Sequence, residues 1–339
     1  MSTIDLLALP FDQYQRYTVV AQIADQVRAH LARPQLRVLD VGGFYRTRQG
    51  ESILPLIHFL PRDQVVAVDQ VTERLSYYIL SDGRSLPFGD EIFDLVASCD
   101  TLEHVPPGGR LAFVDELLRV ARYYVVLIAP FDNESTRLAE QIVYEYLTAQ
   151  GVHHPPFREH RELGLPGADA VRARLAERGL AFVSFADGYL HHWLMMMLIK
   201  HTPGQSLDFH LDLDRYYNKH LSPTDRREPA YRQVFVIAQP GNEELLPAIV
   251  NNLRPAEPPA RAPVFDFVTN LMYALNLSRT TALADALHAA ERQLAGMHSQ
   301  LASLETGNEG LRQTVAAYER GRFIRFMGQV DRWRRKLGI

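Results

Sequence analysis

Short apolar segments that end in an acidic residue restrict the fold of this chain more than any other feature. Residues 36–41 (LRVLDV) form one such segment, directly before Gly42 and Gly43, and residues 65–69 (VVAVD) repeat the pattern. Further apolar runs occupy residues 93–98, 124–130, 181–186 and 233–238. Uninterrupted apolar runs of this length are typical of strands in a parallel sheet that is covered on both faces.

Helical periodicity fills the intervals between these predicted strands. The helical patterns cover residues 14–31, 51–59, 109–121, 136–149 and 168–178. Buried strands that alternate with amphipathic helices predict an α/β fold, a doubly wound Rossmann-like sheet over residues 1–240. Residues 255–263 (PAEPPARAP) contain four prolines, so we predict a Pro-rich linker over residues 241–264.

Acidic residues at the predicted strand ends indicate a ligand site. Asp40 precedes a glycine pair, Asp69 ends the next strand, and Asp82 with Gly83 follows a short apolar run. At such positions a carboxylate can accept hydrogen bonds from ribose hydroxyls or from an adenine amino group. Residues 42–47 read GGFYRT and lack the G-x-G-x-x-G pattern of dinucleotide sites, so we expect a nucleoside whose other end is not a diphosphate.

These motifs resemble those of the class I S-adenosylmethionine-dependent methyltransferases, in particular the branch that acts on small molecules. The matching segments are VLDVGG (38–43), VVAVD (65–69), SDGRSLPFGDEIFDLVASCDTLEHV (81–105) and VVLIAP (125–130). The resemblance implies S-adenosylmethionine as the cofactor.

The same resemblance implies a role for each cofactor residue. The residues concerned are Asp40, Gly42, Gly43, Asp69, Asp82, Gly83, Ser98 and Cys99. Asp40 and Gly42 are expected beside the methionine moiety, and Asp69 at the ribose. Asp82 and Gly83 are expected at the adenine, with Ser98 and Cys99 along the cofactor's edge. Single residues also have structural explanations, such as a turn cap for Asp40.

Two acid–histidine pairs are candidates for catalysis. Glu103-His104 follows the fourth predicted strand, and Glu159-His160 lies in a predicted loop after the fifth. If the methyl acceptor is a hydroxyl, then His104 or His160 can remove its proton, and Glu159 can assist. Alternatively, His104 packs under the cofactor and His160 caps a loop. We expect no metal site, because no HExxH-like spacing joins the remaining candidate ligands, His153, His154, His191 and His192.

The composition of the chain bears on where in the cell the protein is expected to be. The single cysteine, Cys99, excludes an internal disulfide, and the N-terminal residues lack the basic and apolar regions of a secretory signal. The longest apolar run, residues 193–199, is too short to span a bilayer. We therefore expect a cytoplasmic protein. Outside its last twenty residues the chain is acidic, which argues against nucleic acid as a partner.

The heptad pattern beyond the linker predicts a coiled coil over residues 265–319. The seam positions are Leu287, Ala290, Leu294, Met297, Leu301, Leu304, Asn308, Leu311, Val315 and Tyr318. Asn308 falls at an a position, where a buried amide favours two strands in register, so we predict a parallel homodimer. The alternative is an amphipathic helix that folds back on its own globular domain.

Residues 320–339 form a basic amphipathic tail, with seven basic residues and one acidic residue. A helix that carries Phe and Trp on one face and arginines on the others is typical of contact with an anionic membrane surface. Docking on the acidic globular domain is the alternative.

Taken together, these features predict an S-adenosylmethionine-dependent methyltransferase that acts on a hydroxyl of a small molecule or of a glycan- or lipid-linked sugar. The order of domain, linker, coiled coil and basic tail resembles bacterial enzymes of polysaccharide biosynthesis that work at the inner membrane face. The alternative is a non-catalytic scaffold or assembly protein that keeps the methyltransferase-like fold.

Overall fold

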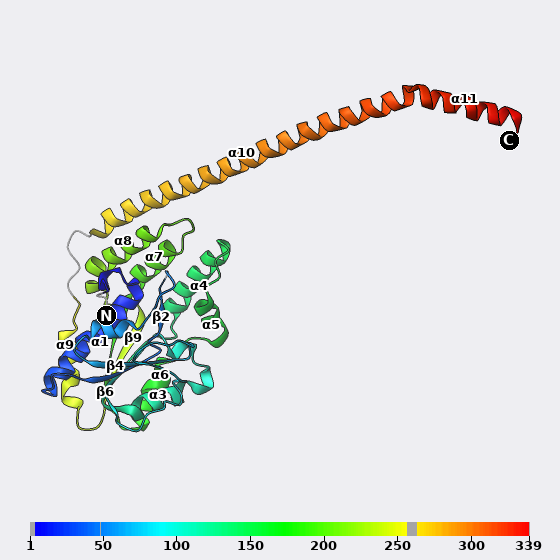
Figure 1. Cartoon of the computed structure of the whole chain (residues 1–339). Helices are drawn as coiled ribbons and strands as arrows, with labels where there is room; N and C mark the ends of the chain where they lie inside the picture. The colour runs from blue at the N-terminus through cyan, green and yellow to red at the C-terminus, as the bar shows by residue number, and fades with distance from the viewer. Residues whose placement is uncertain (1–3, 48, 256–262, 339) are drawn as a thin grey trace. The chain divides into compact units, whose positions relative to one another are not determined.

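The computed structural model describes residues 4–47, 49–255 and 263–338 and divides into two units (Figure 1). The first unit runs to residue 262 and contains the sheet, and the second begins at Pro263 and is helical. Residues 256–262 of the predicted linker lie outside the described residues.

A seven-stranded sheet forms the centre of the first unit in the described part of the chain. Its strands are β1 (Arg37–Val41), β4 (Gln64–Asp69), β5 (Tyr78–Leu80), β6 (Phe93–Cys99), β7 (Ala121–Pro130), β8 (Phe182–Tyr189) and β9 (Ala230–Ala238). They lie in the order β5-β4-β1-β6-β7-β9-β8. Neighbouring strands are parallel from β5 to β7, whereas β9 is antiparallel to both β7 and β8. The predicted Rossmann-like sheet is confirmed, whereas the antiparallel direction of β9 was not predicted from the sequence.

Helices cover both faces of this sheet, as predicted. One face packs against α1 (Phe11–His30), α2 (Pro55–Phe59) and α9 (Leu246–Asn252). The other packs against α3 (Arg110–Val120) and α6 (Ala168–Glu177). Two buried apolar clusters, one on each face, therefore hold the strands in place and fix where their carboxyl ends lie.

Helix α9 belongs to the globular unit, so this unit ends later in the chain than the sequence predicted. Residues 241–254 were predicted as the start of a linker, but Leu246, Ile249 and Leu253 are buried in the cluster beside α1. The globular unit therefore extends beyond residue 240. The proline-rich composition that indicated a linker begins only at Pro255, so the predicted boundary was placed too early.

A layer of helices lies over the carboxyl ends of the central strands. It contains α4 (Glu134–Ala149), α5 (Pro155–Leu163), α7 (Leu190–Lys200) and α8 (Leu207–Tyr216). Helix α5 occupies the segment predicted as a loop. Pro155 and Pro156 suit its first turn, and Gly164 ends it with a φ of +67°. It packs beside η2 (Leu102–His104), which brings the two acid–histidine pairs together.

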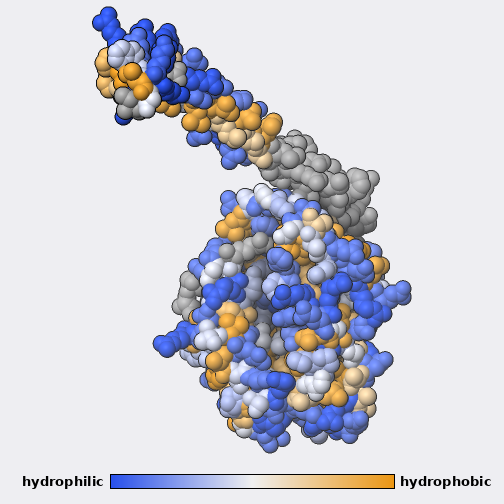
Figure 2. All heavy atoms as spheres, turned by 90° about the vertical axis from the view of Figure 1, so that its right-hand side faces the viewer, coloured by the Kyte–Doolittle hydropathy of each residue, from blue (hydrophilic) through white to orange (hydrophobic). Residues whose placement is uncertain are grey.

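The second unit contains α10 (Pro263–Arg320) and α11 (Arg322–Leu337). The large apolar side chains described in it are exposed, and Figure 2 shows them as orange patches among charged blue ones. The extended backbone at Gly321 separates the two helices. Among the described residues, no helix is both long and apolar enough to cross a membrane.

Candidate active site

The first candidate residues lie at the sharp turn that follows β1. Gly42 has a φ of +86°, and a Cβ there would lie 2.0 Å from Thr101 Oγ1, so the turn requires glycine. A Cβ on Gly43 would lie 2.3 Å from Asp40 Oδ2. Asp40 is buried beside Tyr17, and neither of its carboxylate oxygens has a well-formed hydrogen bond to a described residue. Burial raises the pKa of Asp40 to about 7.

A cleft of about 720 Å³ opens beside this turn, at the carboxyl ends of the parallel strands. Four of the predicted cofactor residues line it: Gly42, Asp69, Asp82 and Gly83. Asp69 ends β4, and its carboxylate accepts hydrogen bonds from the backbone amides of Gln70 (2.7 Å) and Val71 (3.3 Å). The amide of Phe44 reaches its other oxygen at 3.3 Å. These bonds fix an acceptor carboxylate in the wall of a cleft large enough for a nucleoside.

Asp82 and Gly83 lie farther along the same cleft. Arg84 Nη2 lies 2.6 Å from one Asp82 oxygen, and this bond holds the pKa of Asp82 below its usual value. An adenine amino group would therefore share Asp82 with Arg84. Gly83 packs against α3, because a Cβ there would lie 2.4 Å from the Phe113 ring.

Ser98 and Cys99 lie within β6 rather than in the cleft wall. Both are buried, and neither is among the described residues that line the cleft. Asp100 and Thr101, the first two residues beyond the end of β6, line the cleft instead. Thr101 Oγ1 lies 3.2 Å from the carbonyl oxygen of Val41, which ties this loop to the turn after β1.

Asp100, whose side chain is 13% exposed, is an acid that the sequence did not single out. Its carboxylate accepts hydrogen bonds from Arg232 Nε (2.7 Å) and Nη2 (2.6 Å) and pairs with Arg16 of α1. Burial alone would raise the pKa of Asp100, but Arg232 and Arg16 outweigh it and hold the pKa below its usual value. Arg232, a charged residue in the otherwise apolar strand β9, was the sequence signal that could have indicated this acid. Arginine is almost never fully buried without a partner.

A second cavity, of about 340 Å³, adjoins the cleft. The residues that line both are Arg16, Asp100, His104 and Pro156. Trp193 of α7 and Tyr231 of β9 also line the second cavity, and their rings stack with centroids 3.7 Å apart. Because the two spaces share a wall, a molecule in the second cavity would face a molecule in the cleft.

Two imidazole rings from different segments meet in this second cavity. The ring centroids of His104 and His160 are 5.0 Å apart. His104 Nδ1 donates to Glu159 Oε2 (2.7 Å), and His160 Nδ1 donates to buried Glu140 Oε1 (2.8 Å). With its proton on Nδ1, each neutral ring has its lone pair on Nε2. The structure thus brings together the three predicted catalytic residues, His104, Glu159 and His160.

Burial sets the protonation of the groups around this pair. Burial, together with the charge of Asp100, raises the pKa of Glu103 well above its usual value. Burial, together with the neighbouring His160, lowers the pKa of His104, although Glu159 opposes the change. At neutral pH, His104 is therefore an uncharged imidazole that can accept a proton.

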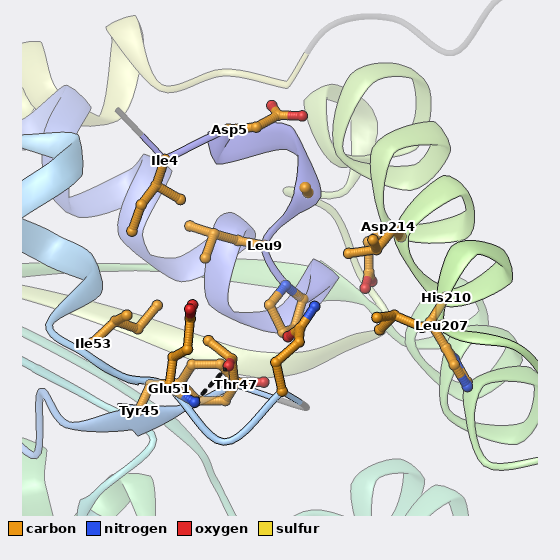
Figure 3. Close-up of a pocket in the computed structure, with 14 residues that line it drawn as sticks. Ile4, Asp5, Leu9, Tyr45, Thr47, Glu51, Ile53, Leu207, His210 and Asp214 are labelled. Carbon is orange, nitrogen blue, oxygen red and sulfur yellow. Dashed lines mark hydrogen bonds between the residues drawn. The ribbon is translucent and has the colours of Figure 1, made fainter. Parts of the chain in front are cut away.

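A third pocket, of about 180 Å³, shares Pro10 and Tyr45 with the second cavity (Figure 3). The N-terminal segment, the hairpin of β2 (Tyr45–Arg46) and β3 (Ser52–Ile53), and α8 surround it. Of the described residues that line it, none belongs to the predicted cofactor or catalytic set. The predicted chemistry is therefore concentrated in the cleft and the adjoining cavity.

Comparison with known proteins identifies the family. A sequence model described as a methyltransferase domain matches residues 52–128. A curated protein of Mycolicibacterium vanbaalenii, described as an uncharacterized methyltransferase, is 30% identical over 182 residues, which are 46% of this chain and 71% of that protein. A similarly described protein of Mycobacterium sp. (strain KMS) is 31% identical over 31% of this chain and 45% of its own length. Magnesium protoporphyrin IX methyltransferase from Synechocystis, solved with bound S-adenosylhomocysteine, is 14% identical with a TM-score of 0.39, over 67% of this chain and 84% of that one.

This chain therefore belongs to the methyltransferase family. Its strand order is that of the class I members, which use S-adenosylmethionine. The residues fit that cofactor, because the cleft combines a tight glycine turn with a fixed carboxylate at Asp69.

Proposed function

We propose that this enzyme methylates a hydroxyl of a small molecule or of a glycan- or lipid-linked sugar. The observation that carries the proposal is the shared wall between the 720 Å³ cleft and the 340 Å³ cavity, with His104 in that wall. One space suits the cofactor and the other an acceptor, and a proton-accepting histidine lies between them. When bound, S-adenosylmethionine supplies an activated methyl group.

In the cleft, the residues bind and orient the cofactor. Asp69 accepts hydrogen bonds from the ribose hydroxyls, and the backbone at Gly42 allows the close approach that a side chain would block. Asp40 lies behind this turn, beside the methionine moiety. Asp82 and Gly83 form the adenine end of the cleft.

In the adjoining cavity, the residues orient the acceptor and accept its proton. The stacked rings of Trp193 and Tyr231 provide a flat apolar surface of the kind that sugar rings and aromatic rings pack against. His104 or His160 accepts the hydroxyl proton at Nε2, and Glu159 holds the His104 ring in position. Orientation of the acceptor is the main contribution that the protein makes to such a transfer.

We also propose that the second unit pairs with a second copy of this chain and binds an anionic membrane surface. The leucines of the predicted seam are more than half exposed in the single chain, which a parallel partner helix would cover. In α11, Phe323, Phe326 and Trp333 are exposed on a helix that carries six basic residues and Asp331. Apolar anchors combined with positive charge suit anionic lipid headgroups.

The test of the enzymatic proposal has two steps. Thermal unfolding is first measured with S-adenosylhomocysteine, which should stabilise the protein by about 2.7 kcal/mol at a hundredfold excess over its dissociation constant. Purified protein is then incubated with S-adenosylmethionine and separate pools of glycans, lipid-linked sugars and small hydroxylated molecules. Release of S-adenosylhomocysteine that depends on a hydroxylated acceptor supports the proposal, and transfer only to amines contradicts it.

A further inference from the structure

We propose that Glu103, His104 and His160 bind one divalent transition-metal cation in the wall of the acceptor cavity. One carboxylate oxygen and one nitrogen from each ring lie within 4.8 Å of one another. From the sequence we expected no metal, because no HExxH-like spacing joins His153, His154, His191 and His192. These ligands come instead from η2 and α5, which are more than fifty residues apart in the chain.

The buried donor atoms of this cluster lack other partners. Glu103 is 1% exposed and His160 is 6% exposed. Glu103 Oε2 and His160 Nε2 have no hydrogen bond to a described residue, although both side chains line the cavity. Buried polar atoms are rarely left in this state, because each unpaired atom forfeits its hydration. A cation between them would satisfy both.

The hydrogen bonds behind the two rings match those of metal-binding histidines. In metal sites, a histidine ligand almost always donates its second ring N–H to a carboxylate or a carbonyl oxygen. Here Glu159 accepts from His104 Nδ1, and Glu140 accepts from His160 Nδ1. Glu140 is fixed in turn by the hydroxyl of Tyr231 at 2.7 Å. These bonds leave the Nε2 lone pair of each ring available to a cation.

The balance of charge around the two rings also favours a cation. The charged groups that interact with Glu103, His104 and His160 include Asp100, Glu140, Glu159, Arg16, Arg110 and Arg232. When Glu103 is ionised as well, the four carboxylates outnumber the three guanidinium groups. Lys200 lines the same cavity, but its ammonium group is paired with Asp214 at 2.6 Å. It therefore does not balance the excess negative charge.

The donor set indicates which cations fit. Two imidazole nitrogens and one carboxylate oxygen suit Zn²⁺, Co²⁺ or Fe²⁺, whereas Mg²⁺ and Ca²⁺ prefer oxygen ligands. With ligand distances of about 2.0–2.2 Å, two donor atoms at the tetrahedral angle of one cation lie roughly 3.4 Å apart. Donor atoms that are as much as 4.8 Å apart would therefore have to approach one another by more than about 1 Å when the cation binds. Side-chain rotations supply this approach. Three protein ligands leave positions open toward the cavity.

The role of this cation rests on the proposed function, whereas its binding does not. An acceptor hydroxyl bound at an open position would be fixed beside the cofactor cleft, and its pKa would fall. With the cation bound, the Nε2 lone pairs of His104 and His160 would be occupied, so the hydroxyl proton would pass to solvent water and the two rings would act as ligands.

Metal binding is measured on the full-length protein after removal of metals. Equilibrium dialysis against Zn²⁺ should give one tight site per chain, and Co²⁺ should give visible absorption of the intensity expected for nitrogen and oxygen ligands. We expect Mg²⁺ not to compete. Glu103→Gln and His160→Ala should each weaken Zn²⁺ binding at least about 100-fold. Glu140→Gln, which keeps all three ligands, should weaken it about 10- to 100-fold.

His154→Ala is the matched control, because His154 lines the same cavity outside the cluster. It should bind Zn²⁺ as the wild type does. Wild-type protein without a tight Zn²⁺ site, or Zn²⁺ binding that survives both Glu103→Gln and His160→Ala, overturns the proposal. Binding of S-adenosylhomocysteine, measured on the same samples, shows that each variant is folded. If that binding persists without a metal site, the proposed methyl transfer stands and only the metal site is lost.

Discussion

Replacement of Asp69 by alanine should weaken cofactor binding without unfolding the protein. Asp69 lies in the cleft wall at the end of β4, where its carboxylate is accessible to a ligand. The backbone amides of Gln70 and Val71 already bind one of its oxygens, so the side chain does not need to reorganise when the ribose arrives. The substitution removes an acceptor that is charged and already in position.

The size of the effect follows from the hydrogen bonds that are lost. A hydrogen bond to a charged group contributes about 1.5–3 kcal/mol when its partner cannot find another acceptor. Because every 1.4 kcal/mol changes affinity tenfold, the dissociation constant of S-adenosylhomocysteine should rise about 10- to 150-fold. Asp69→Asn should lose less, because an amide oxygen can still accept from Gln70 and Val71.

Isothermal titration with S-adenosylhomocysteine measures this change directly. Asp169→Ala is the control, because the Asp169 side chain is 98% exposed on α6 and does not line the cleft. Thermal unfolding without ligand shows whether each variant keeps the wild-type fold. If folded Asp69→Ala binds S-adenosylhomocysteine as tightly as the control does, Asp69 is not a cofactor ligand, and the placement of the ribose at this strand end is refuted.

Three further predictions test other parts of the molecule. First, His104→Ala or His160→Ala should lower turnover about 100-fold or more while S-adenosylhomocysteine still binds in titrations; normal turnover in both would exclude a histidine role and favour nitrogen or carbon chemistry. Second, the pKa of Asp40 is raised by burial from 3.8 to about 7, so Asp40 contributes stability below about pH 4 that is lost as the pH rises through 7. Wild type should therefore lose up to about 4 kcal/mol relative to Asp40→Asn between pH 4 and pH 8 in denaturant titrations, and parallel curves would contradict this. Third, truncation after residue 262 should give a monomer in light scattering that binds cofactor but does not sediment with anionic vesicles; a full-length monomer would refute the dimer.

Most of the fold could be predicted, because strands and helices leave local patterns. The six longer strands each appear as an apolar run, and buried helices repeat their apolar residues at helical spacing. Strand direction leaves no such pattern, because a run buried on both faces reads the same in a parallel or an antiparallel neighbour. The antiparallel placement of β9 was therefore not predictable. Helix α9 was missed because seven residues are too few to show a clear period.

The residues of the site likewise include some that a local sequence pattern indicates and some that it does not. Asp40, Asp69 and Asp82 could be found because each lies within two residues of the end of a recognisable strand, and the strand ends of a parallel sheet meet at one edge. The residues that form ion pairs around the site come from segments that are distant in the sequence. Arg232 reaches Asp100 across 132 positions, and no local pattern indicates that pair. Long-range partners of this kind depend on the packing of whole elements.

The apolar seam of α10 is uncovered in the single chain. In the single chain, Leu287, Leu294 and Leu301 are 54–59% exposed, and Leu304 is 73% exposed. Sequence and structure agree on a long helix with an apolar seam, but a seam stabilises nothing until another surface covers it. Burial of a leucine contributes about 1.5–3 kcal/mol, so several uncovered leucines leave a strong driving force for association. Such a helix is expected to have a partner, and Asn308 at an a position favours a second copy of itself, because its amide can pair with an identical amide only when two helices lie in register.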